Sequence, residues 1–280
     1  MNGNDLVSIL NTPLTRGLLR AIIFTRYKQR GHKIEKVKYH SDLKIWEFRI
    51  DGVSYLSSGP GWVYCYEYLF QQLKSLSGYH YFPHENDVVF DIGAGVGEET
   101  IILSRIVGNK GRVYSFEAHP KTFLALEYLA NSNQFKNVTL SNVALSDERG
   151  LVEIEDSENS LANSILPTEN RKKTFKVEAM TFDDYVTKQG LKRIDLVKMN
   201  VEGAEQLIIK GMTKSLPFIR HVAISCHDFR FRNGESEFFK TKEIVVRFLE
   251  ENGFKVITQQ TNVNMVDDYV YASNPKFEAS

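Results

Sequence analysis

The sequence VVFDIGAGVG, residues 88–97, decides the fold of this chain. Its first half is apolar except for Asp91, which is typical of a buried parallel strand. Gly93, Gly95 and Gly97 then predict a sharp turn in which a ligand can lie against bare backbone. The residues that follow, EETIILSRIVG, carry isoleucines at helical spacing, so the turn leads into the N-terminus of a helix.

A second apolar run, Arg112–Phe116, places Glu117 at its carboxyl end, where an acid can accept hydrogen bonds from both hydroxyls of a ribose. A dinucleotide-binding loop would read GxGxxG and would face a pyrophosphate. Here the spacing is GxGxG, and Glu98 and Glu99 open the helix. Two carboxylates there disfavour a pyrophosphate and favour a ligand with an ammonium or sulfonium group. We therefore expect S-adenosylmethionine as the cofactor.

The composition excludes several classes of protein. The chain has 280 residues, enough for one large α/β core with an N-terminal extension. Lys plus Arg and Asp plus Glu both number 35, which argues against a dedicated nucleic-acid binder. Cys65 and Cys226 lack metal-ligand spacing and are expected to be reduced thiols. We see no secretory signal and no membrane-spanning run, so a cytoplasmic protein is expected.

Residues 1–86 are expected to form an N-terminal helical and β extension. Leu6–Gly31 predicts one or two helices, and the part from Leu14 to Arg30 mixes apolar with basic side chains. Such a helix either packs on its own domain or lies peripherally on an anionic membrane. Three short strands and a helix over 62–76 should follow. The extension would lie beside the cofactor, as part of an acceptor site or lid, or would merely complete the core.

Residues 87–280 alternate strands and helices as in a parallel sheet. Further strands are predicted at 138–145, 194–199 and 221–225, and the last two, at 254–258 and 268–273, should form a reversed hairpin. This arrangement predicts an α/β fold of the class I methyltransferase (Rossmann-like) type with a seven-stranded sheet. A separate hairpin would flank the polar loop 156–173, which is expected to be disordered or to act as an acceptor-side lid.

Four polar residues follow the fourth and fifth predicted strands and should converge near the transferred methyl group: Asn200, Glu202, His227 and Asp228. A histidine with a pKa near neutrality can take the proton of an acceptor hydroxyl. The same side chains could instead hold a divalent cation such as Mg²⁺, with Glu202, His227 and Asp228 as its ligands. Alternatively, Glu202 caps a helix and His227 is structural. Our candidate catalytic residues are His227, Glu202 and Asn200.

Several blocks of the sequence, taken together, resemble the FkbM family of S-adenosylmethionine-dependent methyltransferases. They are VVFDIGAGVGEET, SFEAHPKTFLALEYLANSN, NVALSDERG, MTFDDYV and IDLVKMNVEGAEQLIIKGM, and they run from about residue 87 to residue 212. The resemblance implies O-methylation of a hydroxyl on a sugar, glycan or secondary metabolite. It implies glycine-loop positions at Asp91, Gly93 and Gly97, a ribose acid at Glu117, and the VEGAE motif at Val201–Glu205.

Three positions depart from the family pattern. Gly95 and Ala118 stand where the family often has Asn and Pro. Asn200 stands where an Asp usually precedes VEGAE, which removes a charge that could hold a metal or orient a base. The predicted cofactor-binding residues are Asp91, Gly93, Ala94, Gly95, Gly97, Glu98, Thr100, Glu117, Ala118, Asn142 and Ala144.

Two alternative functions stay open. One is a non-catalytic scaffold that binds the cofactor, which Asn200 favours. The other is a membrane-surface enzyme that methylates a lipid or a lipid-linked glycan, which the segment from Leu14 to Arg30 suggests. A nicotinamide-dependent oxidoreductase is disfavoured by Glu98 and Glu99.

Overall fold

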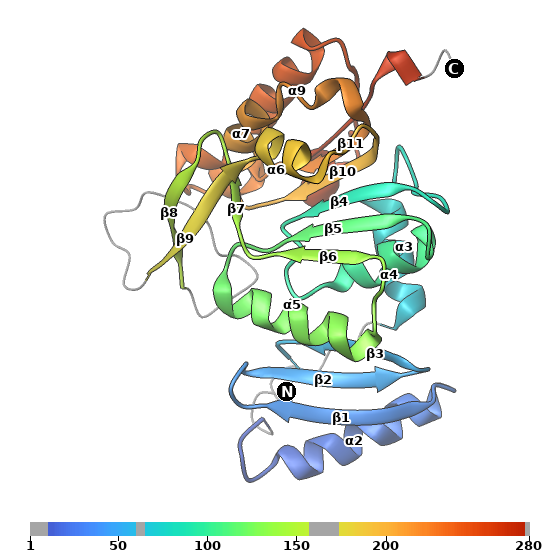
Figure 1. Cartoon of the computed structure of the whole chain (residues 1–280). Coiled ribbons are helices and arrows are strands. Elements are labelled where there is room, and N and C mark those ends of the chain that lie inside the picture. The colour runs from blue at the N-terminus through green and yellow to red at the C-terminus, as the bar shows by residue number, and fades with distance from the viewer. Residues whose placement is uncertain (1–10, 60–64, 157–173, 278–280) are drawn as a thin grey trace.

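A seven-stranded sheet forms the centre of the molecule in a computed structural model, which describes residues 11–59, 65–156 and 174–277 (Figure 1). The strand order is β12-β13-β11-β10-β4-β5-β6. Five strands run parallel: β4 (Val88–Ile92), β5 (Arg112–Phe116), β6 (Val138–Ser141), β10 (Ile194–Asn200) and β11 (Ile219–Ser225). β13 (Tyr269–Ser273) is antiparallel to both β11 and β12 (Lys255–Thr258). The predicted class I methyltransferase topology with its reversed final hairpin is confirmed.

Alternating side chains of the central strands enter two separate cores. Val89 belongs to a cluster that includes Ile101 and Leu129, whereas its neighbour Phe90 packs in a second cluster with Phe182 and Leu249. Helices therefore cover both faces, as a parallel sheet requires. One face carries α3 (Tyr66–Ser75), α4 (Glu98–Val107) and α5 (Pro120–Asn133). The other carries α6 (Phe182–Gln189), α7 (Glu205–Ile208) and α9 (Lys242–Glu251).

The three short strands predicted in the N-terminal part are present, and they form an antiparallel sheet of their own. Its strands are β1 (Ile34–His40), β2 (Ile45–Ile50) and β3 (Val53–Ser57), in that order. α2 (Arg16–Gln29) covers one face of this sheet and α5 the other (Figure 1). Asn133 of α5 binds the backbone of Ser54, accepting from its N–H and donating to its carbonyl, both at 2.9 Å. The Tyr128 hydroxyl donates to the buried Glu47 carboxylate at 2.8 Å. α5 is therefore shared between the two sheets.

The strand predicted at 138–145 is in fact two strands. β6 ends at Ser141, and β7 (Ala144–Ser146) leaves the central sheet to pair with β9 (Thr174–Thr181), which also pairs with β8 (Gly150–Glu155). The break lies at Asn142, because its side-chain amide donates to the carbonyls of Glu117 and Ala118 and turns the chain there.

The remaining elements are short. They are η1 (Ile209–Met212), η2 (Leu216–Phe218), α8 (Asp228–Arg232), η3 (Glu237–Phe239), α10 (Asn264–Asp267) and η4 (Pro275–Phe277). The predicted N-terminal helix begins at Arg16 within the described part, and the one predicted from residue 62 begins at Tyr66. Residues 1–10, 60–64 and the loop 157–173 lie outside the described residues. None of the helices described is both long and apolar enough to cross a bilayer.

Candidate active site

A cavity of about 570 Å³ opens at the carboxyl ends of β4, β5, β10 and β11. Ligands of open α/β sheets bind at this edge. Seven of the predicted cofactor residues and all three candidate catalytic residues line it: Gly93, Ala94, Gly95, Glu98, Glu117, Ala118, Ala144, Asn200, Glu202 and His227. Four predicted cofactor residues do not: Asp91, Gly97, Thr100 and Asn142.

Glu117 sits at the end of β5 and is held by two backbone amides. The Gly95 N–H donates to its Oε2 at 2.9 Å, and the His119 N–H donates to its Oε1 at 2.8 Å. Burial raises the pKa of Glu117 to about 7, although these two donors act in the opposite direction. Each oxygen retains accepting capacity, so the carboxylate can receive two hydroxyl groups from the cavity.

Glu98 and Glu99 open α4, as predicted, but their surroundings differ. Burial, together with the charge of Glu99, raises the pKa of Glu98 to about 7. Glu99 pairs with Lys198 at 2.7 Å and accepts a hydrogen bond from the Ser77 hydroxyl at 2.6 Å. No ion pair to Glu98 occurs within the described part of the chain. Glu98 is therefore the acid available to a cationic ligand.

Asp91 does not line the cavity. It is fully buried, its Oδ1 accepts from the Lys198 ammonium at 2.8 Å, and its Oδ2 accepts from the Thr100 hydroxyl at 2.7 Å. The prediction that Asp91 and Thr100 contact the cofactor directly is therefore corrected. Instead they join β4 to α4 and to β10, beneath the loop that lines the cavity.

Lys198 was missed by the sequence analysis. Its ammonium is buried, and although burial alone would lower its pKa, the carboxylates of Asp91 and Glu99 hold that pKa well above its usual range. A single lysine within the apolar run IDLVKM was the available signal, since lysine is almost never buried unless it is paired.

Two glycines of the loop are required because a side chain there would collide with other parts of the protein. Gly93 has a φ of +74°, and a Cβ there would stand 1.9 Å from the Asn200 carbonyl oxygen. Gly97 has a φ of +96°, and its Cβ would stand 2.6 Å from Leu129 and 2.8 Å from Leu126. The expectation that all three glycines expose backbone to a ligand is therefore wrong at Gly97, which lets α4 approach α5.

His227 lies between two carboxylates at the end of β11. Its Nδ1 is 2.9 Å from the Glu205 Oε1, and its Nε2 is 3.3 Å from the Glu202 Oε1. Burial acts to lower its pKa, but the two carboxylates raise that pKa to about 10. The ring is therefore an imidazolium at neutral pH, and the prediction of a histidine base with a pKa near neutrality is corrected.

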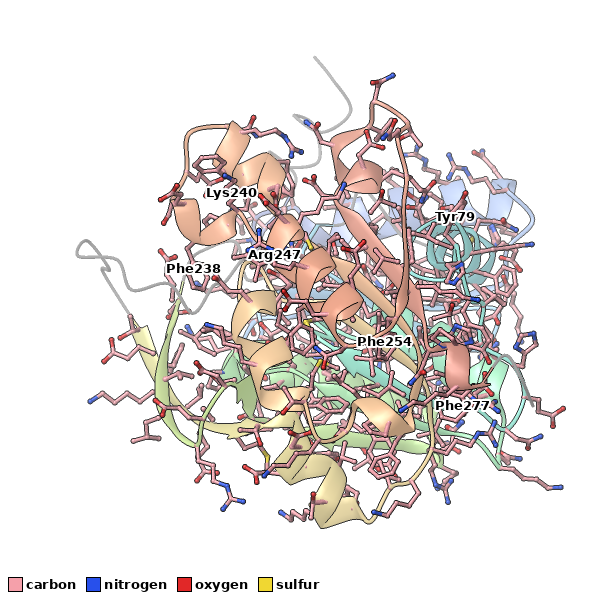
Figure 2. All side chains as sticks on the ribbon, turned by 90° about the horizontal axis from the view of Figure 1, so that it is seen from above. Tyr79, Phe238, Lys240, Arg247, Phe254 and Phe277 are labelled. Atoms are coloured by element: carbon pink, nitrogen blue, oxygen red, sulfur yellow. The ribbon has the colours of Figure 1, made fainter. Side chains whose placement is uncertain are left out.

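Glu202 stands at the cavity end of this group in a left-handed backbone conformation, with a φ of +53°. Burial raises its pKa, but hydrogen bonds from His227 and from Arg230, the latter at 2.6 Å, bring the net value below the usual range. Gly203 follows with a φ of +97°, and a Cβ there would meet Phe238. Figure 2 labels Phe238 and Lys240 on the segment between α8 and α9. This segment therefore packs against the turn that carries Glu202.

Asp228 does not join the cluster. Its Oδ2 accepts from the backbone N–H groups of Thr241 and Lys242, both at 2.9 Å, so it caps the start of α9. The predicted metal set of Glu202, His227 and Asp228 is therefore not assembled. Across the described ranges, no group of three His, Cys, Asp or Glu side chains is arranged to hold a metal ion.

The N-terminal extension reaches the cavity through α3. Tyr68 and Gln72 of this helix line it, and Phe229 of α8 and Met265 of α10 line it as well. These four residues line a part of the cavity wall that neither the glycine loop nor Glu117 forms.

Comparison with known proteins identifies similar methyltransferases. A family model described as a methyltransferase FkbM domain matches residues 91–256. The hexuronic acid methyltransferase AglP of Haloferax volcanii is 27% identical over 144 residues, which cover 51% of this chain and 57% of AglP. The 2-O-methyltransferase NoeI of Sinorhizobium fredii is 26% identical over 164 residues, covering 53% of this chain and 66% of NoeI. The chain thus spans less than two thirds of either curated relative.

Among solved structures, an FkbM methyltransferase from Methylobacillus flagellatus superposes with a TM-score of 0.45 at 16% identity. The match covers 67% of this chain and 43% of that one. Aeropyrum pernix fibrillarin gives a TM-score of 0.45 at 13% identity, over 86% and 99% of the two chains.

Proposed function

The chain belongs to the FkbM methyltransferase domain family, whose model it matches over more than half of its length, and we propose that it transfers a methyl group from S-adenosylmethionine to a hydroxyl oxygen. One observation carries the proposal. Glu117, held by two backbone amides at the end of β5, faces the same cavity as the acid Glu98 at the start of α4.

The cavity offers a partner for each part of this cofactor. Glu117 would accept the ribose hydroxyls, and Glu98 would face the cationic end. Val143, Leu145 and Ile154 supply an apolar wall beyond Glu117, which suits a purine ring. When bound, S-adenosylmethionine supplies an electrophilic methyl group.

Glu202, rather than His227, is the group that we assign to the acceptor's proton. His227 already carries both ring protons, whereas the pKa of Glu202 is lowered and its carboxylate is ionised. Glu202 would take up the hydroxyl proton as the acceptor oxygen receives the methyl group that the bound cofactor would supply. A carboxylate of low pKa is a weak base, so holding the two reactants in line supplies most of the rate.

His227 and Glu205 act as positioning residues in this scheme. Glu205 is fully buried and hydrogen-bonded to the imidazolium, which in turn holds Glu202 toward the cavity.

A sugar or glycan hydroxyl is the acceptor that we propose. The names of the two curated relatives support it, one with a hexuronic acid and the other with transfer to a 2-O position. Two aromatic side chains, Tyr68 and Phe229, line the cavity. Such side chains can pack against the apolar face of a sugar ring.

The test is to incubate the full chain with S-adenosylmethionine and a panel of uronic acids, neutral sugars and phenols. The measurement is the S-adenosylhomocysteine formed, together with the mass of the product. We expect turnover with at least one sugar, and a gain in mass corresponding to one methyl group. Normal cofactor binding with no turnover on any acceptor would favour the non-catalytic scaffold.

Glu202→Gln should lower kcat at least tenfold and leave cofactor affinity unchanged. Glu235→Gln is the matched control, because Glu235 contacts the same Arg230 but does not line the cavity. Equal activity of the two variants would contradict the assignment of Glu202.

A further inference from the structure

The outward face of α2 and the turn before it carry exposed apolar side chains. Leu18 and Ile22 lie four residues apart on one side of the helix and are 58% and 44% exposed, and Leu14, in the turn that precedes Arg16, is 96% exposed. Leu19, Ile23 and Tyr27, by contrast, are buried against the rest of the protein. Single exposed apolar residues are ordinary, but this apolar row of Leu14, Leu18 and Ile22, gathered at the start of one helix, is typical of an interaction surface.

The charges around this row are all of one sign. Arg26, Lys28 and Arg30 are exposed, and none of them forms an ion pair with another described residue. The sequence contains no Asp or Glu between residues 6 and 34. An acidic protein partner could match these cations but would not need the apolar row. An anionic lipid surface matches both, since it offers phosphates beside an acyl boundary.

Within the described part of the chain, α2 is also free to meet a planar surface. It is the outermost layer beneath the N-terminal sheet in Figure 1, and no other labelled element lies beyond it. The candidate active site is built at the edge of a different sheet, so contact at α2 leaves the active site's own residues untouched.

We propose that α2 binds the surface of an anionic membrane. Leu14, Leu18 and Ile22 enter the boundary between headgroups and acyl chains, while Arg26, Lys28 and Arg30 lie at the level of the lipid phosphates. The interaction is independent of methyl transfer, and it would keep the protein close to lipid-linked acceptors.

Co-sedimentation of the full chain with lipid vesicles tests the proposal. Vesicles of phosphatidylcholine alone are compared with vesicles that also contain phosphatidylglycerol. We expect binding to the anionic vesicles only, and binding that weakens as the salt concentration rises. Absence of sedimentation with both kinds of vesicle would overturn the proposal.

A pair of double variants distinguishes binding through α2 from non-specific binding through other exposed apolar residues. Leu18→Glu with Ile22→Glu should lower the vesicle-bound fraction at least tenfold. Leu124→Glu with Leu151→Glu is the matched control, because both leucines are exposed on other elements, α5 and β8. The control should bind like the unmodified chain, and both double variants should keep its thermal midpoint. Equal binding by the two double variants would contradict the role of α2.

A second copy of the chain is the other occupant to test. Sedimentation velocity without lipid should show no change of mass between the unmodified chain and the Leu18→Glu/Ile22→Glu variant. A dimer that this variant converts to a monomer would assign the surface to self-association and would overturn the membrane proposal.

Discussion

Two carboxyl groups with raised pKa values face the proposed cofactor site, and they give cofactor binding a defined pH dependence. The pKa of Glu117 and that of Glu98 are both raised to about 7, mainly by burial. Ribose hydroxyls at one group and a positive charge at the other would stabilise the ionised forms, so both pKa values should fall on binding.

The direction in which the affinity changes with pH follows from the protons that the two carboxyl groups release on binding. Below pH 7 the carboxyl groups carry protons that must be released before the ligand binds, and above it they do not. The affinity for S-adenosylmethionine should therefore rise between about pH 6 and pH 8 and level off above that range. Calorimetry in two buffers of different ionisation enthalpy measures both the affinity and the proton release. An affinity that stays flat, or that falls with pH in this range, would contradict the roles of Glu117 and Glu98.

At the scale of elements, Asp228, the first residue of α8, caps α9 and is not part of the active site. Asp228→Ala removes the acceptor for the first N–H groups of that helix and should cost about 0.5–2 kcal/mol of the free energy of unfolding, measured in urea. Cofactor affinity should be unchanged. Asp228→Asn is the matched control, since asparagine also caps helices well and should retain most of the stability. Loss of turnover at full stability in Asp228→Ala would return Asp228 to the active site.

Most helices and strands could be predicted because a local pattern of apolar residues indicates each of them. The central strands and the reversed final hairpin are runs of this kind, and Glu117 could be placed because it directly follows such a run. The break at Asn142 could not, since the apolar pattern continues through it and the turn depends on the distant carbonyls of Glu117 and Ala118.

Side-chain directions at the active site were less predictable, because they too depend on contacts with residues distant in sequence. The contact between Asp91 and Lys198 joins residues 107 positions apart and depends on the register of β4 against β10. Asp228 was grouped with His227 because the two are adjacent in sequence, but its partners are Thr241 and Lys242, 13 and 14 positions further along the chain. Sequence proximity to a strand end predicts which residues reach the edge of the sheet, and tertiary contacts then decide which of them face the cavity.

At the scale of the whole molecule, the N-terminal sheet and the central sheet share one apolar cluster. It contains Leu19 and Phe48 of the first part together with Ile101 and Leu129 of the second. We therefore predict that the two parts unfold in a single urea transition. Both tryptophans, Trp46 and Trp62, lie in residues 1–86, so fluorescence reports on that part, while far-ultraviolet circular dichroism reports on the whole chain.

The two signals should change at the same urea concentration. Asn133→Ala, which removes the hydrogen bonds to Ser54, should lower both midpoints together, by the equivalent of about 1–3 kcal/mol. A fluorescence transition that precedes the circular dichroism transition would show that residues 1–86 unfold as a separate domain.

The proposed function depends first on the cofactor, and calorimetric titration of the full chain tests it most directly. S-adenosylmethionine and S-adenosylhomocysteine should both bind, and NADH should not. Glu117→Gln should weaken both by about 1.5–3 kcal/mol, because a charged acceptor of the ribose hydroxyls is lost. No binding of either adenosyl compound, or binding of NADH in their place, would contradict the proposed methyltransferase site.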